Sequence, residues 1–318
     1  MPGKNIQQEV FTLFTQQSRE WPLLAENMEG LKSVKIRRFK FDGFSMNAQF
    51  NPKRIVSSAA RVDPLTIRNR PCFLCRENRP PEQKGVDMGN GYSVLCNPYP
   101  IFHRHFTIVR ESHVLQRIRG EFGNFLAISE SLPDLAVFYN GPRCGASAPD
   151  HMHFQAGNKG LMPVEEETKH LLETFGAMLL SGGNTKVWAV DDHLRRFLYI
   201  ESGSAGELEA IFDFVYEIAD SFSADDEPMM NLLSYYSGGW KLYIFLRAKH
   251  RPRQYFLEGE DQILLSPASV DYGGTLIFPL EKDFNRVEKE DILDMLSQVS
   301  ISEKDFDTVT DSLRNYKI

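Results

Sequence analysis

The chain is poor in cysteine and has no long apolar run. Four cysteines among 318 residues are too few for a disulfide scaffold in a chain of this length. No stretch approaches the length of a membrane span, and residues 1–28 lack the apolar core of a secretion signal. We therefore expect a cytoplasmic protein with no membrane partner.

An excess of positive charge is also missing. The formal net charge of −7 argues against a protein that coats nucleic acid, although it leaves room for a local basic pocket. Hydrophobic residues make up 42% of the chain and charged residues 25%, which is ordinary for a soluble globular protein. The length permits one large domain or two smaller ones. Because the sequence has neither a low-complexity stretch nor a flexible linker, we expect its two halves to pack as one body.

The first half alternates strands and helices in an order that suits an antiparallel sheet. The spacing of apolar residues predicts these elements in chain order: helices within 5–28, strands within 34–50, a loop at 76–91, strands at 92–96 and 105–110, a helix at 114–131, a strand at 135–139, a glycine-bearing loop and a histidine-bearing strand. The connections are short enough for antiparallel pairing.

The second half repeats this order without the histidines. Its expected elements are a helix at 164–180, a strand at 195–200, a helix at 205–222, a hairpin of strands at 229–236 and 240–246, a glycine-broken strand pair at 266–279 and acidic helices at 287–317. We therefore predict an α+β protein with two similar antiparallel-sheet halves, residues 1–165 and 166–318, of which the second is a degenerate copy.

Two histidines and a glutamine recur at every second position near residue 153. In an extended strand His151, His153 and Gln155 share one face, whereas Met152 and Phe154 point into the core. A neutral imidazole can attack phosphorus, and backbone N–H groups of the preceding loop, residues 140–147, can hold phosphate oxygens. The same His-x-His pattern also suits zinc. The motif alone supports a metal site and a nucleophile equally well.

A second cluster of candidate ligands begins with Cys72 and Cys75. A redox pair is expected at a strand-to-helix junction, and Pro80-Pro81 close behind argue against a long helix. A metal needs two further ligands, for which His113 and His151 are candidates, and Cys₂His₂ would complete a tetrahedral zinc site. The competing ligands are Cys96 and Cys144, and Cys96 reads as a small core residue.

These motifs, taken in order, resemble the histidine-triad superfamily. The resemblance is carried by Gln49-Phe-Asn-Pro-x-Arg54, Cys72-x-x-Cys75, Asn97, the strand 105–109 leading to His113, Asn140…Gly145-Ala-Ser147 and His151-x-His153-x-Gln155. It covers roughly residues 49–160 and is closest to the branch with glutamine at the third position. That branch contains galactose-1-phosphate uridylyltransferase, diadenosine tetraphosphate phosphorylase and the sugar-nucleotide phosphorylases.

The resemblance implies a role for each motif residue. His153 is the expected nucleophile, and Gln155 donates to the transferring phosphoryl oxygens. The expected ligands of a structural zinc ion are Cys72, Cys75, His113 and His151. Asn97 is expected to bind ribose hydroxyls, and the expected phosphate loop contains Asn140, Gly145 and Ser147. One departure is Asp150, which stands where the uridylyltransferases have proline.

The expected activity is nucleotidyl transfer or phosphorolysis through a nucleotidyl-His153 intermediate. The donor is a sugar nucleotide or a dinucleoside polyphosphate, the acceptor is inorganic phosphate or a sugar phosphate, and the kinetics are ping-pong. The alternatives are a hydrolase of similar nucleotides and a non-catalytic nucleotide-binding protein. The basic run at residues 247–253 could reach a polyphosphate, but we prefer to interpret it as a solvated surface. Neither the base nor the oligomeric state follows from the sequence.

Overall fold

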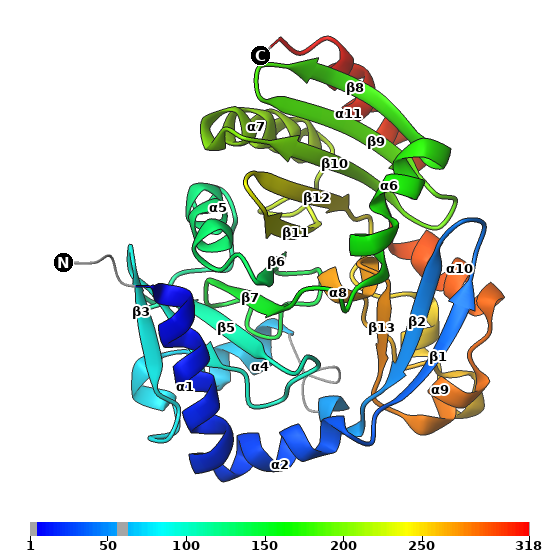
Figure 1. Cartoon of the computed structure of the whole chain (residues 1–318). Coiled ribbons are helices and arrows are strands. Elements are labelled where there is room, and N and C mark those ends of the chain that lie inside the picture. The colour runs from blue at the N-terminus through cyan, green and yellow to red at the C-terminus, as the bar shows by residue number, and fades with distance from the viewer. Residues whose placement is uncertain (1–4, 56–62, 318) are drawn as a thin grey trace.

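The computed structural model describes residues 5–55 and 63–317. Ten strands form one continuous sheet in the order β3-β4-β5-β7-β6-β11-β12-β10-β9-β8 (Figure 1). The strands are β3 (Gly85–Gly89), β4 (Tyr92–Cys96), β5 (His105–Arg110), β6 (Leu135–Asn140), β7 (His153–Asn158), β8 (Gly176–Gly182), β9 (Thr185–Asp191), β10 (Arg196–Ser202), β11 (Met230–Tyr236) and β12 (Trp240–Leu246). All neighbouring pairs are antiparallel.

The strand order confirms the predicted repeat. The first half runs β3-β4-β5-β7-β6 and the second runs β8-β9-β10-β12-β11, so the halves meet where β6 pairs with β11. In each half a helix occupies the same place in the order: α5 (Phe122–Ser131) precedes β6, and α7 (Ala205–Ser221) precedes β11. Residues 141–152 connect β6 to β7, whereas the hairpin turn 237–239 connects β11 to β12. The second half therefore lacks the loop as well as the histidines.

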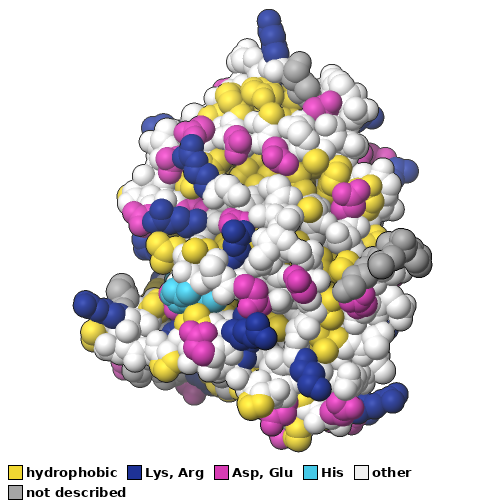
Figure 2. All heavy atoms as spheres, turned by 90° about the vertical axis from the view of Figure 1, so that its left-hand side faces the viewer, with side chains coloured by type: hydrophobic (Ala, Val, Ile, Leu, Met, Phe, Trp, Pro, Cys, Tyr) yellow, Lys and Arg dark blue, Asp and Glu magenta, His cyan; other side chains and the backbone are white. Residues whose placement is uncertain are grey.

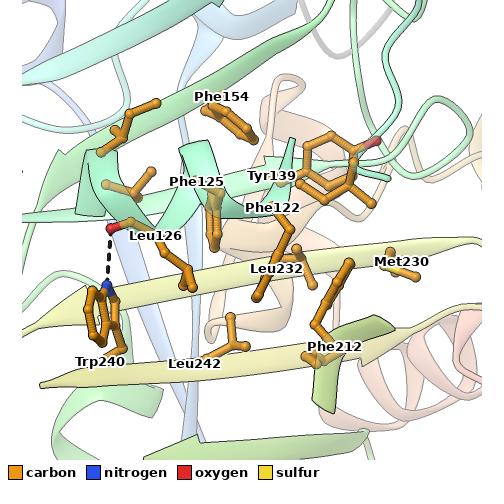
Figure 3. Packing of buried hydrophobic residues seen from close by; sticks show 14 of the residues in the cluster. Phe122, Phe125, Leu126, Tyr139, Phe154, Phe212, Met230, Leu232, Trp240 and Leu242 are labelled. Atoms are coloured by element: carbon orange, nitrogen blue, oxygen red, sulfur yellow. Dashed lines mark hydrogen bonds between the residues drawn. The ribbon is translucent and has the colours of Figure 1, made fainter. Parts of the chain in front are cut away.

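Helices cover one face of the large sheet and build the larger core. They are α1 (Ile6–Glu20), α2 (Pro22–Leu31), α5, α7 and α11 (Glu303–Arg314). Figure 3 shows where α5 and α7 meet over β11 and β12: the Phe122 and Phe212 rings stack with centroids 3.8 Å apart, and Trp240 Nε1 donates to Leu126 O at 3.0 Å. Aromatic stacking and burial of this kind hold the two halves together along β6 and β11.

A small sheet and further helices cover the opposite face. The small sheet has the order β1-β2-β13, with β1 (Lys35–Lys40) antiparallel and β13 (Thr275–Phe278) parallel to β2 (Ser45–Phe50). The remaining helices are α4 (Pro64–Asn69), α6 (Pro163–Phe175), α8 (Ser269–Tyr272), α9 (Glu281–Arg286) and α10 (Lys289–Val299), with 3-10 turns at Pro52–Arg54, Arg76–Asn78, Arg253–Phe256 and Gly259–Asp261. None of the helices within residues 5–55 and 63–317 has the length and apolar character needed to cross a lipid bilayer.

Several predicted elements were wrong in extent or type. The helix expected at 114–131 begins only at Phe122, because Val114 O instead accepts from Met152 N at 2.8 Å and Gly120 adopts a φ of +79°. The helix expected at 164–180 ends at Phe175, and the β8–β9 hairpin follows it. Part of the loop expected at 76–91 is strand β3.

The remaining correction concerns the C-terminal part. The strand pair expected at 266–279 is the short helix α8 followed by the single strand β13. β13 finds its partner far away, in β2. A local hairpin is therefore replaced by a parallel pairing that ties the C-terminal segment to the N-terminal one.

Candidate active site

One cavity of about 550 Å³ contains all six residues predicted to bind or transform a substrate. They are Asn97, Asn140, Gly145, Ser147, His153 and Gln155. The first half supplies these side chains, while the α1–α2 junction and residues 250–277 complete the wall. The structure thus brings the motifs together at the end of β7 where the 141–152 connection enters the strand.

His153 is the first residue of β7 and is buried. Its Nδ1 lies 2.7 Å from the carbonyl oxygen of His151. A carbonyl only accepts, so Nδ1 carries the ring hydrogen and Nε2 is the basic nitrogen. Burial lowers the pKa of His153 to about 4, which keeps the ring neutral near pH 7. A neutral ring with its lone pair on Nε2 is the form a nucleophile needs.

The side chain of Gln116 fixes the backbone of His153. Gln116 is fully buried; its Oε1 accepts from His153 N at 2.8 Å, and its Nε2 donates to His153 O at 3.0 Å and to Asn140 O at 2.9 Å. The β6–β7 register ends at Phe138 opposite Gln155, and its continuation would set Asn140 opposite His153. The amide of Gln116 takes the place of those strand-to-strand bonds where β6 and β7 separate around the loop.

Gln155 is oriented by a second buried histidine, His105. The N–H of Ile101 donates to His105 Nδ1 at 3.3 Å, so Nε2 carries the hydrogen and donates to Gln155 Oε1 at 3.0 Å. Burial, followed by the charge of Arg54, lowers the pKa of His105 to about 3, which holds it neutral. With its oxygen engaged, Gln155 has its amide nitrogen left for the cavity that it lines.

The loop after β6 is attached to the second half. Asn140 Oδ1 accepts from Asn231 Nδ2 at 2.9 Å and from Ser269 N at 2.9 Å, while Asn231 Nδ2 also donates to Cys144 O at 2.8 Å. Gly145 has a φ of +95°, and an added Cβ would lie 2.6 Å from the Cβ of Ala268. Only glycine fits this conformation and this contact, so the loop passes close to the α8 segment.

Asn97 lies in the cavity wall just after β4. Its Oδ1 accepts from Tyr99 N at 3.0 Å, and its Nδ2 donates to Thr107 Oγ1 at 3.2 Å. An amide nitrogen has two hydrogens, so Asn97 retains donor capacity toward a ligand. Ser147 lines the same cavity, and its carbonyl oxygen accepts from Arg70 Nη2 at 3.4 Å.

The four predicted metal ligands form one cluster. The ligand atoms of Cys72, Cys75, His113 and His151 all lie within 4.8 Å of one another. The closest separations are 3.2 Å between His113 Nδ1 and His151 Nδ1, 3.2 Å between Cys75 Sγ and His113 Nδ1, and 3.3 Å between Cys72 Sγ and His151 Nδ1. Tetrahedral zinc with these ligands has ligand-to-ligand edges of about 3.3–3.8 Å. The donor set and spacing therefore fit zinc.

A hydrogen bond outside the cluster prepares His151 as a ligand. Its Nε2 lies 2.6 Å from Arg110 O and therefore carries the hydrogen, which leaves Nδ1 to face the two sulfurs. His151 precedes β7 instead of lying in it, so the expectation that it shares a strand face with His153 was wrong. One imidazole belongs to the ligand cluster and the other to the cavity. The competing ligand Cys96 lies in the core.

Several residues of the site were given no role in the sequence analysis. Gln116, Asn231 and His105 act through hydrogen bonds to the motif residues. The additional cavity-lining residues with polar or charged groups include Arg54, Thr66, Arg70, Gln83, His250, Arg251, Ser266 and Asp271. Among these, the NPxR pattern ending at Arg54 and the basic run at 247–253 were the available sequence signals.

Two family models match this chain, one in each half. Residues 13–158 match the family described as "Domain of unknown function (DUF4922)", and residues 166–316 match "GDPGP1-like, C-terminal domain". No curated protein matched the sequence.

Solved structures share the whole architecture. The yeast Ap4A phosphorylase Apa2 in complex with Ap4A is 16% identical over 95% of this chain and 99% of that chain, with a TM-score of 0.62. The same enzyme in complex with AMP is 17% identical over 92% and 95%, with a TM-score of 0.60. At such identities the likeness establishes the fold. The chain therefore has the fold of this phosphorylase over nearly its whole length, and its C-terminal half matches the GDPGP1-like family model.

Proposed function

We propose that this protein is a nucleotidyltransferase of the phosphorylase type that works through a covalent nucleotidyl-His153 intermediate. The observation that carries the proposal is the state of His153: buried, neutral, with its hydrogen on Nδ1 and its lone pair on Nε2, at the wall of a cavity that Gln155 shares. The substrates we propose are a sugar nucleotide or a dinucleoside polyphosphate as donor and inorganic phosphate or a sugar phosphate as acceptor.

In each step of the proposed reaction, one bond to the α-phosphorus forms and one breaks. Nε2 of His153 attacks the α-phosphorus, a P–N bond forms, and the bond from that phosphorus to the bridging oxygen breaks. The ring becomes positively charged while Nδ1–H still donates to His151 O, and that carbonyl stabilises the charge. An oxygen of the acceptor then attacks the same phosphorus, and the P–N bond breaks to restore neutral His153.

Gln155 favours one class of leaving group. An amide donates hydrogen bonds but has no proton to give, and His105 holds the Gln155 oxygen so that the amide nitrogen faces the cavity. The leaving group must therefore depart as a stable anion, as a phosphate or a phosphate ester does, without general acid catalysis. The amide does not accept a proton either, which disfavours hydrolysis because an attacking water has to lose one.

The zinc site has a positioning role in this proposal. The ion would be held by Cys72, Cys75, His113 and His151. When bound, it would join residues 72–75 and the end of the 105–113 segment to His151, two positions before His153. None of the chemical steps uses these side chains directly. Asn97 would bind the ribose, and Asn140, Gly145 and Ser147 would hold the phosphate oxygens.

The decisive experiment is transfer of label from α-³²P-labelled nucleotide donors onto the protein. We expect label on the native protein, release of that label as a nucleoside diphosphate when phosphate is added, and no label on His153→Ala. His103→Ala, at an exposed position outside the cavity, is the matched control and should label normally. Label on His153→Ala would overturn the proposal. Tight nucleotide binding without label would favour a binding protein, and release of nucleoside monophosphate into water would favour the hydrolase.

A further inference from the structure

The basic run at residues 247–253 divides into three parts in the structure. Arg247 is buried and its guanidinium donates to Asn231 Oδ1 at 2.6 Å and to backbone carbonyls that include those of Lys249 and His250. Arg253 is exposed and pairs with Asp294 at 3.0 Å. His250 and Arg251 line the cavity that contains His153. The solvated-surface interpretation of this run therefore holds for Arg253 but not for His250 and Arg251.

We propose that His250, Arg251 and Ser266 form an anion subsite that holds the phosphate group of the acceptor, which is also that of the leaving group in the reverse direction. Its place in the reaction rests on the proposed function, but anion binding at these residues does not. The ligand class is a phosphate dianion, either free inorganic phosphate or the phosphate of a sugar phosphate.

The charge of the cavity lining supports an anionic ligand. The chain is acidic, with a net charge of −7, and basic and acidic side chains are intermixed over the face in Figure 2. Yet the charged lining residues are Arg54, Arg70 and Arg251 against a single carboxylate, Asp271, among the described residues. Asp271 oxygens already accept from Ala268 N and Ile277 N at 2.8 and 3.0 Å. The cavity is thus basic within an acidic protein.

Arg70 and Arg54 lie at other parts of the wall. Arg70 is paired with Asp150 at 2.8 Å. Arg54 donates to Tyr99 O at 2.8 Å, so it belongs with the segment that follows β4. Among the described residues of the second half, Arg251 is therefore the cation that lines the cavity, and His250 precedes it in the chain.

The geometry of Arg251 suits a fixed anion site. Its Nε lies 3.0 Å from Ser266 Oγ, and its guanidinium lies 4.0 Å above the ring of Tyr255. Stacking and this hydrogen bond orient the planar guanidinium, whose paired N–H groups match phosphate oxygens. Burial lowers the pKa of Arg251, since the cation has lost part of its hydration.

His250 adds a neutral donor to this positive surface. Burial, and then the charges of Arg251, Arg247 and Arg143, lower its pKa to about 3, so it binds through a ring N–H and not through charge. Arg143 is itself paired with Asp225, and Arg247 holds the carbonyls of residues 249 and 250. The backbone under His250 is therefore held rigidly, and the imidazole and guanidinium are presented side by side in the chain.

The test is equilibrium binding of inorganic phosphate and of a hexose 1-phosphate to the full-length protein by titration calorimetry. Arg251→Gln should weaken both at least tenfold, whereas Arg253→Gln, which removes an exposed charge from the same run, should leave both unchanged. Binding to the native protein should also weaken as salt is raised. If Arg251→Gln fails to fold, Ser266→Ala and Arg251→Lys serve instead, and both should weaken binding because each removes part of the oriented fork.

The outcomes separate this inference from the proposed function. If neither anion binds the native protein, or if Arg251→Gln binds them as tightly as Arg253→Gln does, the subsite is wrong even when His153 becomes labelled. If Arg251→Gln loses anion binding while native protein acquires no label, the subsite stands and the proposed function fails. Tighter binding of hexose 1-phosphate than of free phosphate would identify the phosphate as part of a sugar phosphate, and equal affinity would identify free phosphate as the ligand.

Discussion

Replacement of Gln116 by methionine tests whether His153, the proposed nucleophile, is held by a side chain from outside its own strand. Methionine has a similar length and volume, so Gln116→Met removes the amide without opening a large cavity. It leaves three buried backbone groups without their partner: His153 N–H, His153 C=O and Asn140 C=O. None of these groups can turn to bulk water, because Gln116 is fully buried and His153 is nearly so.

The expected loss of stability follows from these three groups. A buried donor or acceptor that loses its partner costs about 1–3 kcal/mol. The low end of this range applies to each group, because each carbonyl has a second lone pair and the backbone can relax. The expected loss of stability for the three groups together is about 3 kcal/mol. This is a large part of the roughly 5–15 kcal/mol that stabilises a typical domain. Relaxation of His153 by as little as about 1 Å would also slow nucleotidyl-enzyme formation by about 100-fold.

Two measurements and one control test whether Gln116 holds His153 in place. Urea unfolding gives the change in stability, and single-turnover labelling at saturating donor gives the rate of the first step. Gln254 is a buried glutamine in the C-terminal segment, where its Nε2 donates to Asp294 Oδ2. Gln254→Met should lower stability and leave the labelling rate unchanged. A Gln116→Met protein that loses less than about 1 kcal/mol and labels at the native rate would refute the reasoning, since His153 would then be held by the strand alone.

The fold was predictable where the signal is local. The strands at 92–96 and 105–110 and the hairpin at 229–246 are short apolar runs bounded by turn residues, and the structure has them at or within a residue of those bounds. The expected helix at 114–131 failed in its first part. Its apolar spacing looks helical, but Val114 and Gln116 are bonded to β7 and to the segment just before it. β13 likewise depends on a distant partner strand.

The site shows the same division between local and distant information. Most motif residues were recognisable because they lie at short spacings, as in the loop at 140–147, the pattern from His151 to Gln155 and the pair Cys72 and Cys75. The residues that hold them come from elsewhere: Gln116 is 37 positions from His153, His105 is 50 from Gln155, and Asn231 is 91 from Asn140. A side chain that bonds to a distant residue leaves no period in the sequence. The motifs were therefore recognisable in the sequence, whereas the tautomers, orientations and anchoring of the groups required the structure.

The remaining predictions concern the metal ligands, acceptor choice and pH. Cys75→Ser should lose about one zinc ion per chain, measured by plasma mass spectrometry, together with stability; retained zinc would contradict the four-ligand site. Gln155→His should raise the ratio of hydrolysis to phosphorolysis, because a neutral imidazole can accept the proton that an attacking water loses and the amide cannot; an unchanged ratio would place acceptor choice elsewhere. Burial lowers the pKa of His105 from 6.5 to about 3, so below pH 6.5 the unfolded chain takes up a proton that the native protein excludes. This residue should therefore remove about 1.4 kcal/mol of stability for each unit that the pH falls between those two values. The stability advantage of native protein over His105→Gln, from urea unfolding, should shrink by that slope toward acid pH, and parallel curves would mean that His105 is protonated in the folded state.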